Sequence, residues 1–251
     1  MSPDSQQTRM QAVVKAIAKY HPTFPEEIVG CTPDELEELR RLVPRPIPND
    51  YVEFAQLMGH STGELILFFD SNFHVQSLIK HFSKKSVLAI PERYFRIGTA
   101  ENDPYEHYFL DCEAERGPSV VRFATSTKKQ LLQEALEVQE LLAYSLPELI
   151  FIRGYYEYHI SKFEVSQYLN ALEDTDNFIE QVTPLLTMLG FRRHSQSEWG
   201  LAFYEKADTV VVASLGLGKG PYLHVVSQKR SELRKLTDIL TQRLPLRSPD
   251  S

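Results

Sequence analysis

The sequence has no long apolar run and only two cysteines. Its longest unbroken run of apolar residues, 65–69, has five members, whereas a membrane-spanning helix needs about 20. Lys15 and Lys19 interrupt the apolar residues near the N-terminus, so we expect no signal peptide. Cys31 and Cys112 lie far apart, without neighbouring metal-ligand patterns. We therefore expect a cytoplasmic protein with reduced thiols and no membrane partner.

Catalytic patterns are also missing. The glycine-rich stretch 216–220 is followed by Pro221 and not by a helix, which predicts a hairpin turn rather than a phosphate-binding loop. The histidines include no pair four residues apart on a helix, so no metal site is expected. Asp103 and Asp111 bracket a predicted strand, but their turn and strand-end positions favour structural roles over paired acid and base. We expect no enzyme activity, no catalytic residue and no cofactor.

Acidic residues are in excess and are concentrated in two stretches. The formal net charge is −7. Residues 26–64 contain nine acids and three arginines, and residues 101–116 contain six acids and one arginine. This excess argues against a nucleic-acid partner and favours association with a basic protein. A solvated face that only keeps the protein soluble has the same composition, so both interpretations stay open here.

The first part of the chain predicts helices, then strands, then a helix. Thr32, Pro33 and Glu35 form a capping-box pattern at the start of a leucine-rich helix. A similar pattern at Thr127 and Gln130 opens a later helix, whose apolar residues run from Leu131 to Leu142. The other predicted helices are 6–20 and 49–58, and the predicted strands are 64–69, 87–90, 93–97, 107–110 and 119–124. The fold class is therefore α+β, with an antiparallel meander sheet flanked by helices.

The second part predicts a connector and a smaller domain. Within residues 148–173, 151–158 suits a strand and 163–169 suits a helix, and we treat this segment as a connector. Residues 174–245 predict a small C-terminal α-β-β-β-α unit, with its strands at 200–205, 210–215 and 222–226. The first domain then covers residues 1–147. The single tryptophan, Trp199, suits either a core position or an interface in the C-terminal unit.

Short motifs in the first domain occur in a recognisable order. The leucine-rich helix 34–42 is followed by Pro-Asn-Asp-Tyr at 48–51, Ile-Gly at 97–98, Tyr-Phe-Leu-Asp at 108–111, and a final strand before a helix. In order and spacing, residues 30–145 resemble the SUKH superfamily. Two features depart from the family pattern. Residues 59–63 stand where the family often has an Asn-Gly-Gly-like turn, and the C-terminal unit lies outside the family's core.

The resemblance implies a SUKH-like fold and a non-enzymatic binding function. Bacterial members of the superfamily are mostly immunity proteins, which bind and neutralise toxin domains such as nucleases. The expected partner is therefore a protein toxin domain, basic in charge, and the chain is expected to be a monomer or weak dimer. The superfamily is also similar to a yeast regulator of cell-wall synthesis, so an intracellular interaction scaffold or regulator is the alternative.

The resemblance carries over no contact residues, so we predict them from acidity and expected exposure. They lie on the acidic helix, at the junction that follows it, and in the turn near residue 105. The predicted partner-binding residues are Glu35, Glu38, Asp50, Glu53, Asp103, Tyr105 and Glu106.

Overall fold

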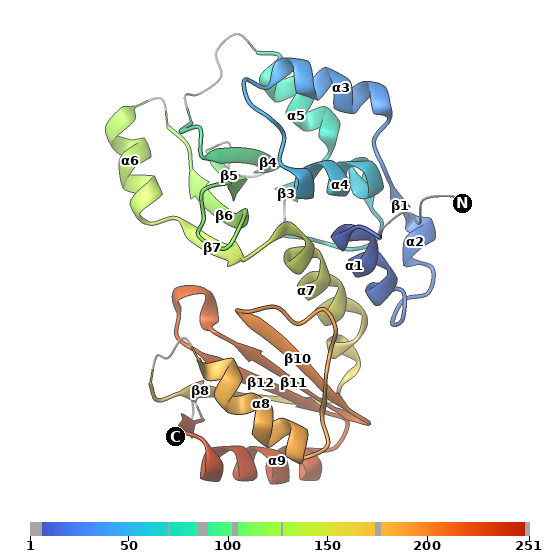
Figure 1. Ribbon diagram of the computed structural model, residues 1–251, viewed down its shortest axis with the longest axis vertical. Helices are drawn as coiled ribbons and strands as arrows, with labels where there is room; N and C mark the ends of the chain where they lie inside the picture. The colour runs from blue at the N-terminus through green and yellow to red at the C-terminus, as the bar shows by residue number, and fades with distance from the viewer. Residues whose placement is uncertain are drawn as a thin grey trace, which may run out of the picture. The chain divides into compact units, whose positions relative to one another are not determined.

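The chain folds as two compact units, residues 1–155 and 156–251. The computed structural model describes residues 7–69, 71–84, 90–101, 105–126, 128–173 and 177–248. Both units combine helices with antiparallel sheets, as the sequence predicts at this level (Figure 1). None of the helices in the described part of the chain has the length and apolarity needed to cross a membrane.

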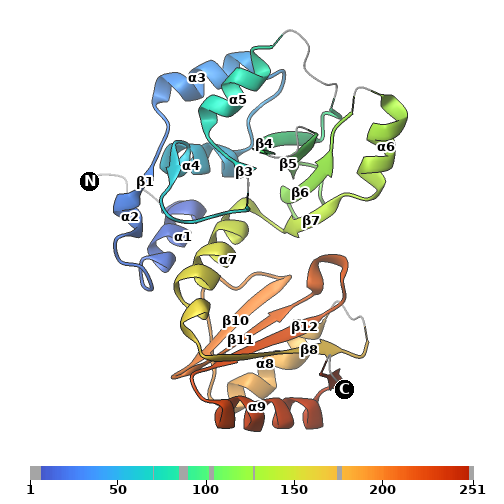
Figure 2. The same cartoon turned by 180° about the vertical axis from the view of Figure 1, so that it is seen from behind.

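The first unit begins with helices, and side-chain caps fix the starts of α1 and α3. The helices are α1 Arg9–Ile17, α2 Phe24–Glu27, α3 Pro33–Leu42, α4 Asn49–Met58 and α5 Val75–Phe82. Thr8 caps α1 together with Gln11, and Thr32 caps α3 together with Glu35. Both pairs form capping boxes, which satisfy backbone N–H groups that the helix leaves free. The predicted α1, α3 and α4 are confirmed, and α3 and α5 lie side by side (Figure 2).

A five-stranded antiparallel sheet follows, in the order β3-β4-β5-β6-β7. Its strands are β3 Ser71–Asn72, β4 Tyr94–Ala100, β5 Glu106–Asp111, β6 Ser119–Ala124 and β7 Glu140–Ala143. The predicted strands 93–97, 107–110 and 119–124 are confirmed. Leu132 of α6 Lys129–Glu137 packs on one face with Tyr94, Phe109 and Phe123. The predicted cap residue Thr127 and residues 87–89 of a candidate strand lie outside the described residues.

Two predictions in the first unit are wrong. The last helix was expected to continue to Leu142, but it ends at Glu137, and Leu141 pairs with Val121 in an edge strand. Residues 64–69 were expected to form a buried strand. Instead β1 Ile28–Val29 pairs with β2 Ser61–Thr62, and the chain then runs through turns and bends. There the hydroxyl groups of Thr62 and Ser71 donate to the carbonyl groups of Leu65 and Phe68, so these carbonyls have local partners instead of a strand partner.

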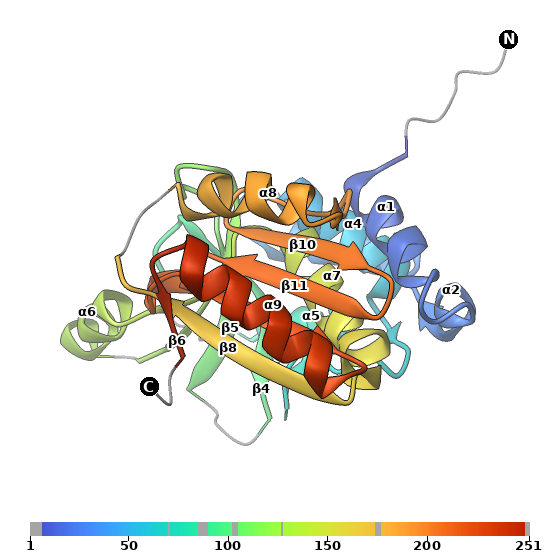
Figure 3. The same ribbon diagram turned by 90° about the horizontal axis from the view of Figure 1, so that it is seen from below.

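The second unit contains a six-stranded antiparallel sheet, in the order β13-β8-β12-β11-β10-β9. Its strands are β8 Val165–Ala171, β9 Arg192–Arg193, β10 Leu201–Lys206, β11 Thr209–Ser214, β12 Tyr222–Ser227 and β13 Leu246–Arg247. Helices α8 Phe178–Met188 and α9 Arg230–Arg243 cover one face (Figure 3). Alternate strand residues such as Tyr204, Val211 and Leu223 face them in the core. The predicted helices, three central strands and hairpin connection at 216–220 are confirmed.

The segment assigned to a connector has the opposite secondary structure to the one expected. Residues 151–158 belong to α7 Leu146–Tyr158, and a short 3₁₀ turn, Ile160–Lys162, follows it. Residues 165–171 form β8, which pairs with β12 and β13 and so enlarges the predicted α-β-β-β-α unit. Helix α7 has apolar residues around its whole circumference, which leaves no helical periodicity to detect. Trp199, just before β10, is 38% exposed, so its surface is only partly buried.

Candidate functional site

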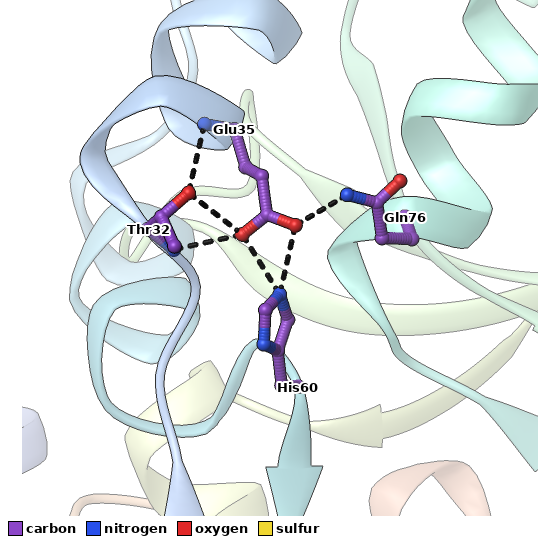
Figure 4. Close-up of polar contacts among 4 residues, drawn as sticks. All are labelled: Thr32, Glu35, His60 and Gln76. Atoms are coloured by element: carbon purple, nitrogen blue, oxygen red, sulfur yellow. Dashed lines mark hydrogen bonds and ion pairs between the residues drawn. The ribbon is translucent and has the colours of Figure 1, made fainter.

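Glu35 is the centre of a polar cluster in the first unit (Figure 4). Its carboxylate accepts hydrogen bonds from the backbone N–H of Thr32 at 2.8 Å and from the Thr32 hydroxyl at 3.0 Å. It also accepts from Nε2 of His60 at 2.9 Å and from the side-chain amide of Gln76. Because Gln76 belongs to α5 and His60 directly precedes β2, this one carboxylate joins three parts of the unit.

These hydrogen bonds determine the charge of Glu35. Desolvation by partial burial opposes ionisation, but the donors from Thr32, Gln76 and His60 together lower the pKa of Glu35 to about 2. The group is therefore ionised at neutral pH. Its side chain is only 15% exposed, and both of its oxygens already accept hydrogen bonds within the chain. Glu35 thus organises the structure around it, and its carboxylate is poorly placed to meet a partner.

The other predicted acidic contacts differ in exposure. Glu53 of α4 is half-buried and accepts a hydrogen bond at 3.2 Å from the backbone N–H of Met10, in the first turn of α1. Asp50 is also half-buried, in the first turn of α4, and makes contacts within the chain. Glu38 is exposed on the surface of α3. Of these three residues, only Glu38 presents an exposed carboxylate.

The predicted turn near residue 105 supplies one exposed side chain. Tyr105 is 62% exposed, and its backbone carbonyl accepts a 2.6 Å hydrogen bond from Thr125. Glu106 begins β5 and pairs with Arg122 at 3.4 Å, and Arg122 also pairs with Glu140 of β7. Asp103 lies outside the described residues. Glu106 is thus partly neutralised within the sheet, which weakens its attraction for a basic partner.

A cavity of about 230 Å³ lies next to the Glu35 cluster. Its walls include Met58, His60, Thr62, Leu65, Phe73 and His74. His60 therefore has two roles, since it donates to Glu35 and forms part of the cavity wall. The cavity also borders Ile66, in the segment where the sequence predicted a buried strand.

The segment after β2 presents large apolar side chains to solvent. Ile66 is 58% exposed and Phe69 is 85% exposed, while the neighbouring Leu65 and Leu67 are buried. Val29 of the adjoining β1–β2 pair is 49% exposed. Exposed acids occur in the same region, and Gly63 packs against the side chain of Glu27 beside β1. We call this region the loop surface, formed by Glu26, Val29, Glu64, Ile66 and Phe69.

Sequence reasoning missed the loop surface because five consecutive apolar residues look buried. The signals that argue for a loop are Gly63, which has a φ of +65°, and the absence of alternation in the run. A glycine in this conformation starts a turn, and the described residues 64–69 beyond it make no strand pairing. Ile66 and Phe69 are therefore exposed because the chain turns here, which their residue types alone do not predict.

Comparison with protein-family models, with curated proteins and with solved structures gives no match for this chain. Among the residues with a described structure, no group of three or more His, Cys, Asp or Glu side chains is placed to hold a metal ion. Cys31 is half-buried and Cys112 is exposed, and neither forms a disulfide.

Proposed function

We propose that this chain is a non-enzymatic binding protein that attaches to a basic toxin domain and neutralises it, as immunity proteins do. Two things support the proposal: the order of motifs that resembles the SUKH superfamily over residues 30–145, and the loop surface. The loop surface is the observation on which the proposal mainly rests, because it combines exposed apolar side chains with exposed acids around β1 and β2 of the first unit.

Exposed apolar side chains of this size favour a partner-binding role. Burying apolar surface is worth about 25 cal/mol per Å², and a few anchors at the centre of an interface usually supply most of its affinity. Phe69 and Ile66 are 85% and 58% exposed, within four residues of each other. A partner that covers both side chains removes them from water together. A single exposed apolar residue offers less area to bury and is common on protein surfaces.

The surrounding charges favour a basic partner. Glu64 is exposed two residues before Ile66, Glu26 is exposed in α2 just before β1, and Asp34 and Glu38 are exposed on α3. The neighbouring Glu37 is partly neutralised by Arg40 and Arg41, at 3.6 and 3.7 Å. Long-range attraction of this kind raises the association rate with a cationic surface and weakens as salt is added. A toxin that acts on nucleic acid needs such a cationic surface.

The proposal is tested by affinity capture from a lysate of the native host, with matched variants of the chain as bait. The tagged chain is compared with an Ile66→Ser, Phe69→Ser double variant and with a Val138→Ser control, because Val138 is 80% exposed in the same unit but lies outside the loop surface. We expect one stoichiometric partner with a basic domain, retained by the control and weakened more than tenfold by the double variant. Equal capture by all three proteins contradicts the role of the loop surface. Several substoichiometric partners favour the scaffold alternative.

A further inference from the structure

A cavity of about 350 Å³ lies in the second unit, where three segments of the chain meet. Its lining comes from the chain at the end of α8, from the turn between β10 and β11, and from one side of α9. Small-molecule sites in proteins typically have volumes of about 300–1,000 Å³. The second unit therefore has room for a small ligand at this position.

The more buried part of the lining is apolar. Phe191 and Leu236 are buried and belong to the hydrophobic core of the unit, and the half-buried Leu189 packs against the same core. Ile239 of α9 is partly exposed and adds a further apolar side chain to the wall. A ligand that enters the cavity thus brings apolar surface out of water, which favours a ligand with an apolar body.

The exposed part of the lining is charged. It contains three lysines, Lys206, Lys229 and Lys235, and two acids, Asp208 and Glu232. Lys235 pairs with Glu232 at 3.3 Å. Within the described part of the chain, no carboxylate pairs with Lys206 or Lys229. The three lysines and two acids leave a formal charge of +1, so the cavity favours an anionic ligand over a cationic one.

Lys206 is held in position at the cavity. Its Nζ atom donates to the backbone carbonyl of Leu189 at 2.7 Å and lies 5.7 Å from the centre of the Phe191 ring. The turn that carries it is tied to the chain leading into α9, because the backbone N–H of Gln228 donates to the carbonyl of Asp208 at 3.0 Å. An ammonium group has three donors, so two remain for a ligand. A cation that is already fixed in place loses less entropy when the ligand binds.

We propose that this cavity binds a small amphipathic carboxylate, with its apolar body against Phe191 and Leu236 and its charged group at Lys206 and Lys229. A single negative charge balances the formal charge of +1, whereas a doubly charged phosphate would be left with an excess of negative charge beside the acids of the lining. The site lies in the second unit, so it is independent of the loop surface and of the proposed function.

The test uses sodium octanoate as the probe and the intact chain as the receptor. Octanol supplies the same apolar body without a charge, acetate supplies the charge without the body, and octyl phosphate, doubly ionised, supplies a second charge. We expect calorimetry to show one octanoate site, with an affinity at least tenfold higher than that for any of the three references. In NMR spectra, added octanoate should shift the amide resonances of Ala207 and Leu236, which both line the cavity.

Matched variants separate the two parts of the site. A Lys206→Met, Lys229→Met double variant keeps the apolar stems and removes both charges, so it should bind octanoate at least tenfold more weakly. Ile239→Ser removes part of the apolar wall and should also weaken octanoate binding. Arg234→Met is the control and should bind octanoate as the wild type does, because Arg234 is exposed on α9 but does not line the cavity.

Four outcomes overturn the proposal. Two are an octanoate affinity no higher than that for octanol, and one no higher than that for octyl phosphate. The third is equal octanoate binding by the double variant and by Arg234→Met. The fourth is a set of octanoate-dependent shifts confined to residues outside the cavity, such as Ile66 and Phe69 of the loop surface. If the double variant does not fold, the position of the shifts in the wild-type protein decides the question alone.

Discussion

The carboxylate of Glu35 accepts a hydrogen bond from His60 at 2.9 Å, and this contact holds the start of α3 against the chain that leads into β2. His60 in turn forms part of the wall of the 230 Å³ cavity beside the loop surface. An acidic residue that the sequence marked as a partner contact thus acts inside the protein. Glu35 therefore holds together the chain beside the loop surface and is not itself a part of that surface.

Replacing Glu35 by alanine should destabilise the first unit. The change leaves the N–H of Thr32, the amide of Gln76 and the ring of His60 without their common acceptor, and lost hydrogen bonds to a charged group are worth about 1.5–3 kcal/mol each before water replaces them. We expect a net loss of about 1–3 kcal/mol in the free energy of unfolding, measured by denaturant titration. Glu38→Ala on the same helix is the control and should change stability by less than about 0.5 kcal/mol. Equal effects of the two substitutions would show that the cluster contributes nothing.

Acid should weaken the protein through Glu35. Its folded-state pKa, about 2, lies below the ordinary value of 4.5, so the native state holds the carboxylate ionised where the unfolded chain has begun to take up a proton. The stabilisation is therefore complete above pH 4.5 and is lost as the pH falls toward 2. Unfolding measured across this window should show a smaller loss for Glu35→Gln than for the wild type. Parallel curves for the two proteins would contradict this assignment.

His224 should make the second unit sensitive to mild acid. It accepts or donates a 3.1 Å hydrogen bond with the Tyr156 hydroxyl, and its ring stacks on Tyr168 with 4.2 Å between ring centres. Burial lowers the pKa of His224 to about 4, so the native ring stays neutral while the unfolded ring gains a proton below about pH 6.5. Stability should fall as the pH drops from 6.5 to 4, by at most about 1.4 kcal/mol per pH unit for this one group.

The matched variant for this prediction is His224→Phe, which keeps an aromatic ring against Tyr168 and removes the titrating group. Its unfolding free energy should depend less steeply on pH between 6.5 and 4 than that of the wild type. His81, in the first unit, has a similarly lowered pKa and titrates in both proteins, so the difference between the two curves isolates His224. A difference that does not change with pH would exclude the proposed titration.

Gly30 should not tolerate a side chain. A Cβ atom at this position would lie 1.9 Å from the backbone oxygen of Gln56 in α4, and a backbone atom cannot move aside as a flexible side chain can. Gly30 follows β1, which carries Val29 of the loop surface. Gly30→Ala should therefore destabilise the first unit by about 1–3 kcal/mol or more, measured by thermal or denaturant unfolding. A variant as stable as the wild type would mean that the chain at the end of β1 is packed less closely against α4 than this distance indicates.

The elements predicted correctly are those whose own sequence determines them. Thr32 and Glu35 specify the start of α3 through local hydrogen bonds, and β10, β11 and β12 are apolar runs separated by glycine-rich or polar turns. The errors occurred where distant contacts decide. Residues 165–171 became a strand because β12 and β13 lie on either side, and no short-range pattern contains that information.

The candidate site was harder to predict than the fold. Acidity identified Glu35 and Glu53, but only the folded chain shows that their carboxylates accept hydrogen bonds from His60 and Met10. The exposed residues Ile66 and Phe69 are apolar, so composition placed them in the core. Exposure depends on which side of a turn a residue occupies, and that is settled by packing rather than by residue type.

The most direct test of the proposed function measures neutralisation itself. The basic domain of the captured partner is purified, and its toxic activity is titrated with the wild-type chain, with the Ile66→Ser, Phe69→Ser double variant and with Val138→Ser. The wild type and Val138→Ser should abolish the activity at one equivalent, and the double variant should need more than a tenfold excess. Full activity of the partner in the presence of saturating wild-type chain would contradict the proposed neutralisation.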